Sequence, residues 1–407
     1  MLDLTKLARQ MQGISDHLSQ EATAAQQRIK IAQNLMRLAT TEQTQRTQEL
    51  NDYCDRFIFA AAEPIEPLNT HLSIDTAPEA HTVISSDGSQ ISPSHHEIAY
   101  CYLLNISRII IHYGQSRYPL LDSLPEVIYR PEDLYASRKW GIRTEEWMGY
   151  KRTAAEAVML GELGIESVRA TGSQNKRGTK PSQKQNIPTL AMTDGSLIYW
   201  FLEQIPAKAR DEILLPILEA WDRLRTAKVP VMGYISASRS GEALNFLRLQ
   251  ACPYETPDCL THCEENRNQT PCNAFSPLRD VTLWATALSP GERGPLWKSS
   301  ADILSCYGEH SVYFCYVHVG AEVARVEFPQ WVVEDKALLN SALSLMLAQV
   351  QKGFGYPVAL AEAHNQAVVR GGDRTRFFAL LEQQMIRAGL KNVGTSFKEA
   401  RKRGSIA

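Results

Sequence analysis

The sequence predicts an α/β fold in which a mixed sheet is flanked by helices and preceded by a long helical arm. Short apolar and β-branched runs, which are typical of strands, alternate with amphipathic segments of helical length between residues 80 and 380. Residues 312–319 and 322–328 form a hairpin pattern around Gly320-Ala321. Alternating strands and helices with a hairpin indicate a mixed sheet covered by helices.

The helical arm is expected over residues 1–62. One apolar stripe has alternating three- and four-residue steps; its members are Leu4, Leu7, Met11, Ile14 and Leu18. Such a helix needs a partner surface, because an isolated amphipathic helix is marginal in water. Its own domain and a second copy in a dimer could each provide that surface, and both alternatives remain open.

A single domain is expected over residues 80–380, after a connector at 63–80. Its strands are predicted at 81–85, 99–104, 106–112, 189–192 and 229–235. Its helices are predicted at 151–163, 208–226, 241–250, 335–352, 356–369 and 373–388. Residues 124–150 are expected to be irregular.

Two predicted strands are each followed by the same three residues. ISSDGSQ at 84–90 and AMTDGSL at 191–197 both place an Asp at the end of a short apolar strand, before Gly and Ser. One Asp-Gly-Ser is a common turn, but two copies in the same context are more informative. Carboxylates on neighbouring strands repel each other unless a hard cation lies between them. Asp87 and Asp194 therefore predict a shared divalent-metal site.

Further ligands are expected from two helices. Glu156 and Glu162 lie six residues apart on one predicted helix, so only one of them should face the site, and either could be a solvated position. His364 could bind a metal or a phosphate, although a lone His is more often structural. Arg374 could clamp a phosphate, or Asp373 and Arg374 could cap the next helix.

The hairpin offers another candidate contact. Arg325 and Glu327 share one face of a strand. An ion pair between strands and a phosphate contact by Arg325 both fit this pattern.

Charge and hydropathy limit the partners. The net charge of −2 excludes a generally basic polyanion binder, so contact with nucleic acid would depend on local patches. Two such patches are a loop at 169–186, with five basic residues and no acidic one, and a basic tail at 381–407.

No apolar run reaches the roughly 20 residues of a membrane helix, and the N-terminus lacks a signal peptide's apolar core. We therefore expect a cytoplasmic protein without membrane contact.

Half of the eight cysteines lie in an insertion at 252–272. Cys252, Cys259, Cys263 and Cys272 could hold zinc or an iron–sulfur cluster, and His262 could replace one of them. Their spacing is not the usual CxxC pair, so free thiols are the alternative. The other four, expected to be scattered buried thiols, are Cys54, Cys101, Cys306 and Cys315.

These segments together resemble the NurA nuclease family. The resemblance rests on the two Asp-Gly-Ser segments, YISASRS at 234–240, YVHVG and ARVEFP within 316–329, and GYPVALAEAHNQAV with DR within 355–374. It implies an RNase H-like core and a manganese or magnesium cofactor. It also implies degradation of DNA from ends, typically 5′ to 3′, and cutting of single strands. Expected partners are single-stranded DNA, duplex ends, a second copy in a homodimer and a HerA-type hexameric ATPase that acts with the family in end resection and double-strand break repair.

The resemblance also assigns roles to residues. Asp87 and Asp194 match the metal-binding aspartates, His364 matches a C-terminal histidine, and Tyr316 matches an aromatic position near the site. Arg152 and Glu156 best fit an Arg–Glu pair on a helix, with Glu162 in reserve because the loop at 169–186 is an insertion. The residues expected to contact nucleic acid are Arg239, Arg325 and Arg374.

Two other functions are compatible with the same residues. A non-catalytic adaptor that binds DNA ends or an ATPase would keep the basic segments but lack a complete metal site. A metal phosphoesterase on the same core would instead cleave RNA or hairpins. The presence of both Asp87 and Asp194 favours the nuclease over the adaptor.

Overall fold

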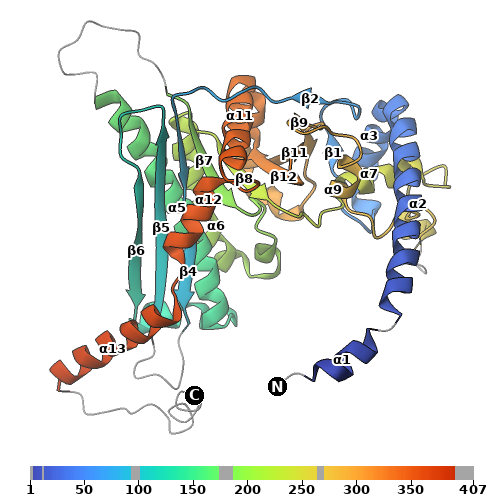
Figure 1. Cartoon of the computed structure of the whole chain (residues 1–407). Helices are drawn as coiled ribbons and strands as arrows, with labels where there is room; N and C mark the ends of the chain where they lie inside the picture. The colour runs from blue at the N-terminus through green and yellow to red at the C-terminus, as the bar shows by residue number, and fades with distance from the viewer. Residues whose placement is uncertain (1–2, 12, 93–100, 174–186, 264–269, 390–407) are drawn as a thin grey trace, which may run out of the picture. The chain divides into compact units, whose positions relative to one another are not determined.

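The computed structural model describes residues 3–11, 13–92, 101–173, 187–263 and 270–389. The chain forms two compact units (Figure 1). The first contains Met1–Ile74, Ile235–Leu304 and Ser311–Glu327; the second contains Asp75–Tyr234, Ser305–His310 and Phe328–Ala407. This division cuts across the single domain expected at 80–380 and joins the N-terminal arm to later segments.

A five-stranded arrangement forms the centre of the second unit. Its strands are β3 (His81–Ser85), β5 (Tyr102–Tyr113), β6 (Leu120–Ile128), β7 (Thr189–Asp194) and β8 (Val231–Ile235). They lie in the order β6-β5-β3-β7-β8, with β3 antiparallel to β5 and parallel to β7, and with β7 parallel to β8. The expected mixed sheet is therefore confirmed.

The first strand of this sheet continues past Asp87. The strand β4 (Gly88–Ile91) pairs with β5 in the same register as β3: His81 lies opposite Tyr113, and Gly88 lies opposite Ile106. Asp87 was expected at a strand end, but it lies inside one long antiparallel pairing with β5. Only the parallel pairing with β7, which ends at Ser85, stops before it.

Helices cover both faces of the sheet. A Cβ atom on Gly88 would meet Glu156 and Arg152 of α5 (Thr144–Ser173), so this side of the strand faces α5. The next side chain, Ser89, donates to the carbonyl of Ala367 at the end of α12 (Val358–Ala367). Because neighbouring side chains point to opposite faces of a strand, α5 and α12 lie on opposite faces.

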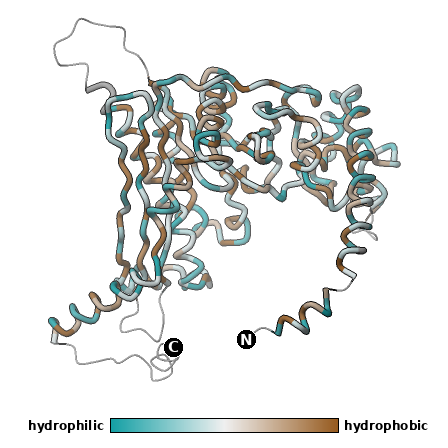
Figure 2. Tube along the Cα trace, viewed as in Figure 1, coloured by the Kyte–Doolittle hydropathy of each residue, from teal (hydrophilic) through white to brown (hydrophobic). Residues whose placement is uncertain are grey.

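Other helices complete the second unit. They are α4 (Pro131–Leu134), η2 (Ala136–Trp140), η4 (Trp200–Gln204), α6 (Ala207–Thr226), η7 (Gly308–His310), α10 (Gln330–Glu334), α11 (Lys336–Lys352) and α13 (Gly371–Arg387). Gly161 lets α5 approach α6 closely, because a Cβ there would lie 3.0 Å from that of Ala220. The strands beneath these helices are mostly hydrophobic (Figure 2).

The first unit contains the arm and a sheet of short strands. Its helices are α1 (Leu4–Gln10), α2 (Ile14–Thr41), α3 (Gln43–Asp52), η1 (Cys54–Arg56), α7 (Glu242–Gln250), α8 (Cys259–His262) and α9 (Asp280–Trp284), and η6 (Asp302–Cys306) ends beyond it. Its strands are β1 (Glu63–Pro64), β2 (Leu72–Ser73), β9 (Glu292–Arg293), β10 (Trp297–Lys298), β11 (Val312–His318) and β12 (Val323–Pro329), the last extending into the second unit. The predicted hairpin is β11 and β12.

The helical arm is confirmed, and its two halves differ. Ala32 and Ala39 of α2 are buried in the core of the first unit, as is Leu50 of α3. By contrast, α1 has no buried residue, and Leu4 and Leu18 are exposed. Packing against its own unit therefore accounts for the later half of the arm, and the dimer remains a prediction for the earlier half.

Three sequence-based boundaries were wrong. Residues 124–150 are not irregular, because β6 and the first turns of α5 occupy much of them. Asn105 does not divide two strands; it lies inside β5, where its side chain donates to the Ala367 carbonyl at 2.8 Å. The helix expected at 151–163 extends to Ser173, and residues 174–186 of the predicted basic loop lie outside the described residues. No helix in the described ranges is both long and apolar enough to cross a membrane.

Candidate active site

Asp87 is fixed by the backbone around it. Its N–H donates to the Ser107 hydroxyl at 2.9 Å, and its carbonyl accepts from the Ser107 N–H at 2.8 Å. Its own carboxylate accepts from the Gly88 N–H at 2.7 Å. These bonds join Asp87 to β5, so its position depends on the strand pairing and not on a free turn.

Asp194 ends β7, where Gly195 takes a positive φ of 106° that favours glycine. Asp194 pairs with Tyr234 of β8, and the Tyr234 ring lies edge-on to Tyr356, 5.8 Å away. Desolvation and the nearby Asp87 raise the pKa of Asp194, while a hydrogen bond from the Tyr356 hydroxyl opposes this rise. This role of Tyr356 could not be predicted from the sequence, because only the fold brings its hydroxyl to Asp194.

Glu156 is the most strongly perturbed group in this region. Burial raises its pKa to about 8; Arg152 opposes the rise, and Asp87 adds to it. Its Oε1 atom is buried and has no hydrogen-bond partner among the described residues. Glu162, the reserve candidate, is exposed on the same helix and does not line the pocket described below.

His364 reaches the site from α12. Its Nδ1 lies 3.2 Å from Oδ2 of Asp87, and its side chain is 66% exposed. An exposed imidazole beside a carboxylate can meet an approaching substrate and hold or release a proton there.

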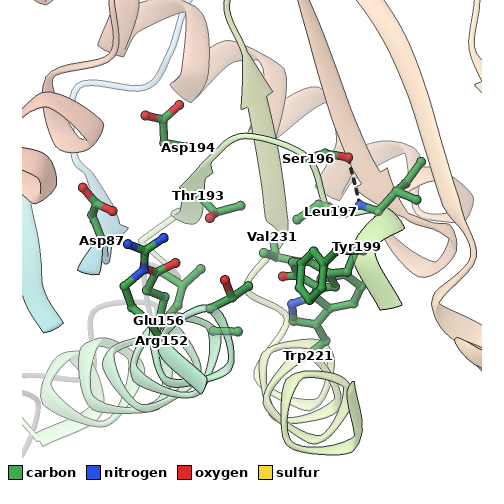
Figure 3. Close-up of a pocket in the computed structure, with 15 residues that line it drawn as sticks. Asp87, Arg152, Glu156, Thr193, Asp194, Ser196, Leu197, Tyr199, Trp221 and Val231 are labelled. Carbon is green, nitrogen blue, oxygen red and sulfur yellow. Dashed lines mark hydrogen bonds and ion pairs between the residues drawn. The ribbon is translucent and has the colours of Figure 1, made fainter. Parts of the chain in front are cut away.

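A pocket of about 280 Å³ is lined by Asp87, Asp194 and Glu156, and His364 is not among its lining residues (Figure 3). Asp87, Asp194 and Glu156 lie at one end of it, and Tyr199 and Trp221 lie toward the other. The remaining lining residues are Arg152, Thr153, Ala157, Leu160, Thr193, Ser196, Leu197, Ile198, Phe201 and Val231. The elements predicted to carry the metal site thus do bring their carboxylates into one pocket.

The donor chemistry of this pocket suits a hard divalent cation. Its three carboxylates, with the His364 imidazole beside Asp87, are ligands that such ions take, and Oε1 of Glu156 is a buried acceptor without a hydrogen bond that a cation would satisfy. Across the described ranges, however, no group of three or more His, Cys, Asp or Glu side chains is arranged to hold a metal ion. Arg152, whose Nε lies 3.2 Å from Oε1 of Glu156, is a cation beside that carboxyl group (Figure 3).

Tyr316 was expected near the site, but its surroundings do not fit that role. It is fully buried in the core of the first unit, and its hydroxyl donates to Asp280 at 2.6 Å. Burial raises its pKa well above the ordinary value, so the hydroxyl stays protonated. Tyr316 therefore supports the packing of the first unit.

Arg325 was expected to contact nucleic acid, but it is 2% exposed. It pairs with Glu242 at 2.8 Å and with Glu327 at 2.7 Å, and it donates to the Ser240 hydroxyl. Arg325 is therefore held in ion pairs, but the predicted pair between strands is wrong, because its partners lie on its own strand and on α7.

Arg239 and Arg374, the other two arginines predicted to contact nucleic acid, are both exposed. Arg374 lies over the Phe378 ring, 5.4 Å from its centre. The neighbouring Asp373 accepts from the Arg370 N–H and caps α13, as the alternative reading predicted. Contact of Arg239 and Arg374 with nucleic acid remains a prediction.

The expected zinc or iron–sulfur site is not supported. All eight cysteines are free thiols, and the described ranges contain no group of ligands that could hold an ion. Cys259, Cys263 and Cys272 are buried, and burial raises the pKa of Cys259 and Cys263, which keeps these thiols protonated. Residues 264–269 of the insertion lie outside the described residues. Of the other four, Cys54 is exposed, which corrects its expected burial.

The raised pKa of Glu156 predicts a pH-dependent stability in metal-free protein. Folded protein keeps the proton up to about pH 8, whereas an ordinary glutamate loses it near 4.5. The contribution of Glu156 to the free energy of unfolding is therefore full below pH 4.5, and it is lost as the pH rises through about 8. We expect Glu156→Gln to become more stable than wild type across that window, by on the order of 1–3 kcal/mol. Urea unfolding in chelator at several pH values measures this difference, and parallel curves for the two proteins would contradict it.

Comparisons with known proteins agree with the resemblance seen in the sequence. A family model described as the NurA domain matches residues 81–369, more than two thirds of the chain. No curated protein matches the chain.

Solved structures show distant similarity. The NurA nuclease from Sulfolobus solfataricus is 12% identical, with 95% of this chain and 98% of that chain covered and a TM-score of 0.49. A structure of NurA with manganese is 10% identical, with 79% and 91% covered and a TM-score of 0.32. A type 1 RNase H with the type 2 active-site motif, LC9-RNase H1, is 9% identical, with 53% and 90% covered and a TM-score of 0.17.

Proposed function

Because this chain belongs to the NurA family, we propose that it is a metal-dependent nuclease that hydrolyses phosphodiester bonds in DNA. The observation that carries this proposal is the group of carboxylates around one pocket: Asp87, Asp194 and the buried Glu156. Three such groups in one small space are unfavourable unless positive charge accompanies them. A metal-dependent nuclease needs clustered carboxylates, because they must hold the cation at a place where it also contacts the phosphate of the substrate.

We assign the metal ligands to Asp87, Asp194, Glu156 and His364, with manganese or magnesium as the ion. When bound, the metal lowers the pKa of the attacking water and stabilises charge on the leaving oxygen. The chain's own residues set up this chemistry. Tyr356 holds the Asp194 carboxylate through its hydroxyl, and the Ser107 backbone and side chain hold Asp87.

His364 is the group best exposed to substrate. Its imidazole beside Asp87 can carry a proton to or from an oxygen of the phosphate that enters the pocket. Arg239 and Arg374, both exposed, are proposed to contact the DNA backbone, since guanidinium groups bind phosphate well.

Family membership also supports the finer parts of the proposal. We propose 5′ to 3′ removal of nucleotides from ends, cutting of single strands, assembly as a homodimer, and work with a HerA-type hexameric ATPase during end resection. The exposed apolar residues of α1 and early α2, such as Leu4 and Leu18, support contact with a second copy.

The first test is cleavage of DNA labelled at either end, in manganese and in chelator. We expect degradation of linear single strands and duplex ends only with manganese, with label lost first from the 5′ end. A closed circular single strand should also be cut, because this requires endonuclease activity. RNA of the same sequence is the matched substrate and should be cut more slowly.

Different results would favour the other functions. Absence of DNA cleavage, even after addition of a HerA-type partner, would favour the non-catalytic adaptor. Rapid cleavage of RNA or hairpins with little action on DNA ends would favour the other phosphoesterase.

A further inference from the structure

Arg152 lies where positive charge is needed among the carboxylates. Its side chain extends from α5 into the pocket that Asp87 also lines, and its Nε lies 3.2 Å from Oε1 of Glu156 (Figure 3). The Arg152 side chain is 35% exposed, so it is not sealed in the core. No other Lys or Arg lines this pocket among the described residues.

The contact between Arg152 and Glu156 is close but poorly formed. Nε of Arg152 lies 3.2 Å from Oε1 of Glu156, yet both atoms are buried and neither makes a hydrogen bond to a described residue. A well-formed pair would use the guanidinium fork and two parallel hydrogen bonds. The Arg152 guanidinium is therefore attracted to Glu156 by charge, but no well-formed hydrogen bond fixes it there.

The sheet has made room for both side chains. A Cβ atom at Gly88 would lie 2.5 Å from Oε1 of Glu156 and 2.8 Å from Cγ of Arg152. Only glycine at this position allows both side chains to approach the strand that carries Asp87. The absence of a side chain at Gly88 therefore leaves the space next to Asp87 to Arg152 and Glu156.

Resting on the proposed function, we infer that Arg152 is a built-in counter-cation that a divalent metal displaces from Glu156, after which its guanidinium contacts a DNA phosphate. When Glu156 is ionised, a metal ion and Arg152 compete for the same carboxylate oxygen, so they cannot both neutralise it fully. The displaced Arg152 guanidinium remains beside the pocket, because its side chain extends from α5. A guanidinium there is placed to bind the backbone of a substrate.

This inference predicts opposite effects on two ligands. Arg152→Met keeps most of the apolar stem and removes the charge. We expect it to bind manganese roughly 5- to 100-fold more tightly than wild type, because the metal no longer displaces a charged partner. We also expect its rate of DNA cleavage at saturating manganese to fall at least about 10-fold, because the phosphate contact is lost.

The metal measurement is a manganese titration by calorimetry without DNA, so it does not depend on catalysis. Lys151→Met is the matched control: Lys151 is the preceding residue on α5, is 36% exposed, and pairs with Glu212 at 2.9 Å. It should leave manganese affinity and cleavage close to wild type. Arg152→Lys retains the charge and should bind manganese about as weakly as wild type.

Each outcome decides a different point. Equal or weaker manganese binding by Arg152→Met, while wild type binds the metal, would overturn the competition and leave the nuclease proposal intact. Tighter manganese binding with unchanged cleavage would overturn the phosphate contact. A wild type that binds no manganese would overturn the metal role itself and the inference with it.

Discussion

Asp194→Asn is expected to lower the rate of DNA cleavage by about 100-fold or more, with little loss of stability. The change keeps the size of the side chain and removes the charge proposed to bind the metal. A bound metal contributes several kcal/mol to the transition state, and each 1.36 kcal/mol is a factor of ten in rate. Loss of one charged ligand should therefore remove most of the activity.

The neighbourhood of Asp194 explains why the fold should tolerate this substitution. Its pKa is raised, so the charged form is already disfavoured in metal-free protein. An amide at this position can still accept the hydrogen bond from Tyr356. Removing the charge also relieves the repulsion from Asp87.

Cleavage of end-labelled DNA with manganese, alongside thermal unfolding, measures both effects. Asp87→Asn should behave in the same way, since Asp87 shares the pocket. Glu219→Gln is the control, because Glu219 is an exposed carboxylate on α6 that does not line the pocket. Cleavage that persists in folded Asp87→Asn and Asp194→Asn would show that the active site lies elsewhere.

Arg325→Ala is expected to destabilise the protein by roughly 3–5 kcal/mol, the usual effect of removing one partner from a buried ion pair. The substitution would leave Glu242 and Glu327 buried without their shared cation. It would also remove a guanidinium that packs 3.6 Å from the centre of the Phe314 ring. The size of the loss comes mainly from the two uncompensated carboxylates.

Urea unfolding followed by tryptophan fluorescence measures this loss. Arg239→Ala is the matched control in the same unit: Arg239 is exposed, so its loss should change stability by less than about 0.5 kcal/mol. The same two variants separate the roles predicted for these arginines. If Arg325→Ala weakened DNA binding at unchanged stability, the phosphate contact would be correct and the buried-pair interpretation wrong.

The central strands could be predicted because each is an apolar run next to a clear turn signal. Asp87 and Asp194 followed from the same pattern, since both come directly after such a run. By contrast, β6 contains Pro125 and exposes Leu121 and Leu124, so it lacks the pattern of a buried strand. Proline is tolerated there because β6 is hydrogen-bonded only to β5 among the described strands.

Side chains that meet across long sequence distances could not be placed from the sequence. Period-two spacing puts Arg325 and Glu327 on one face, but it cannot show that β12 is buried on both faces. Helical spacing separates Glu156 from Glu162, but only the approach of α5 to Gly88 shows that Glu156 faces the pocket. In both cases the sequence does not show which element packs against the face of the strand or helix.

The unbroken register of β5 against both β3 and β4 has a consequence for how this chain can change in length. Adding or deleting one residue on either side of Asp87 would turn its carboxylate to the opposite face of the sheet, away from His364. The register of β7, by contrast, is set by its own pairing with β3. Natural variants and engineered fusions should therefore reject even a single-residue change of length in β3, β4 or β5.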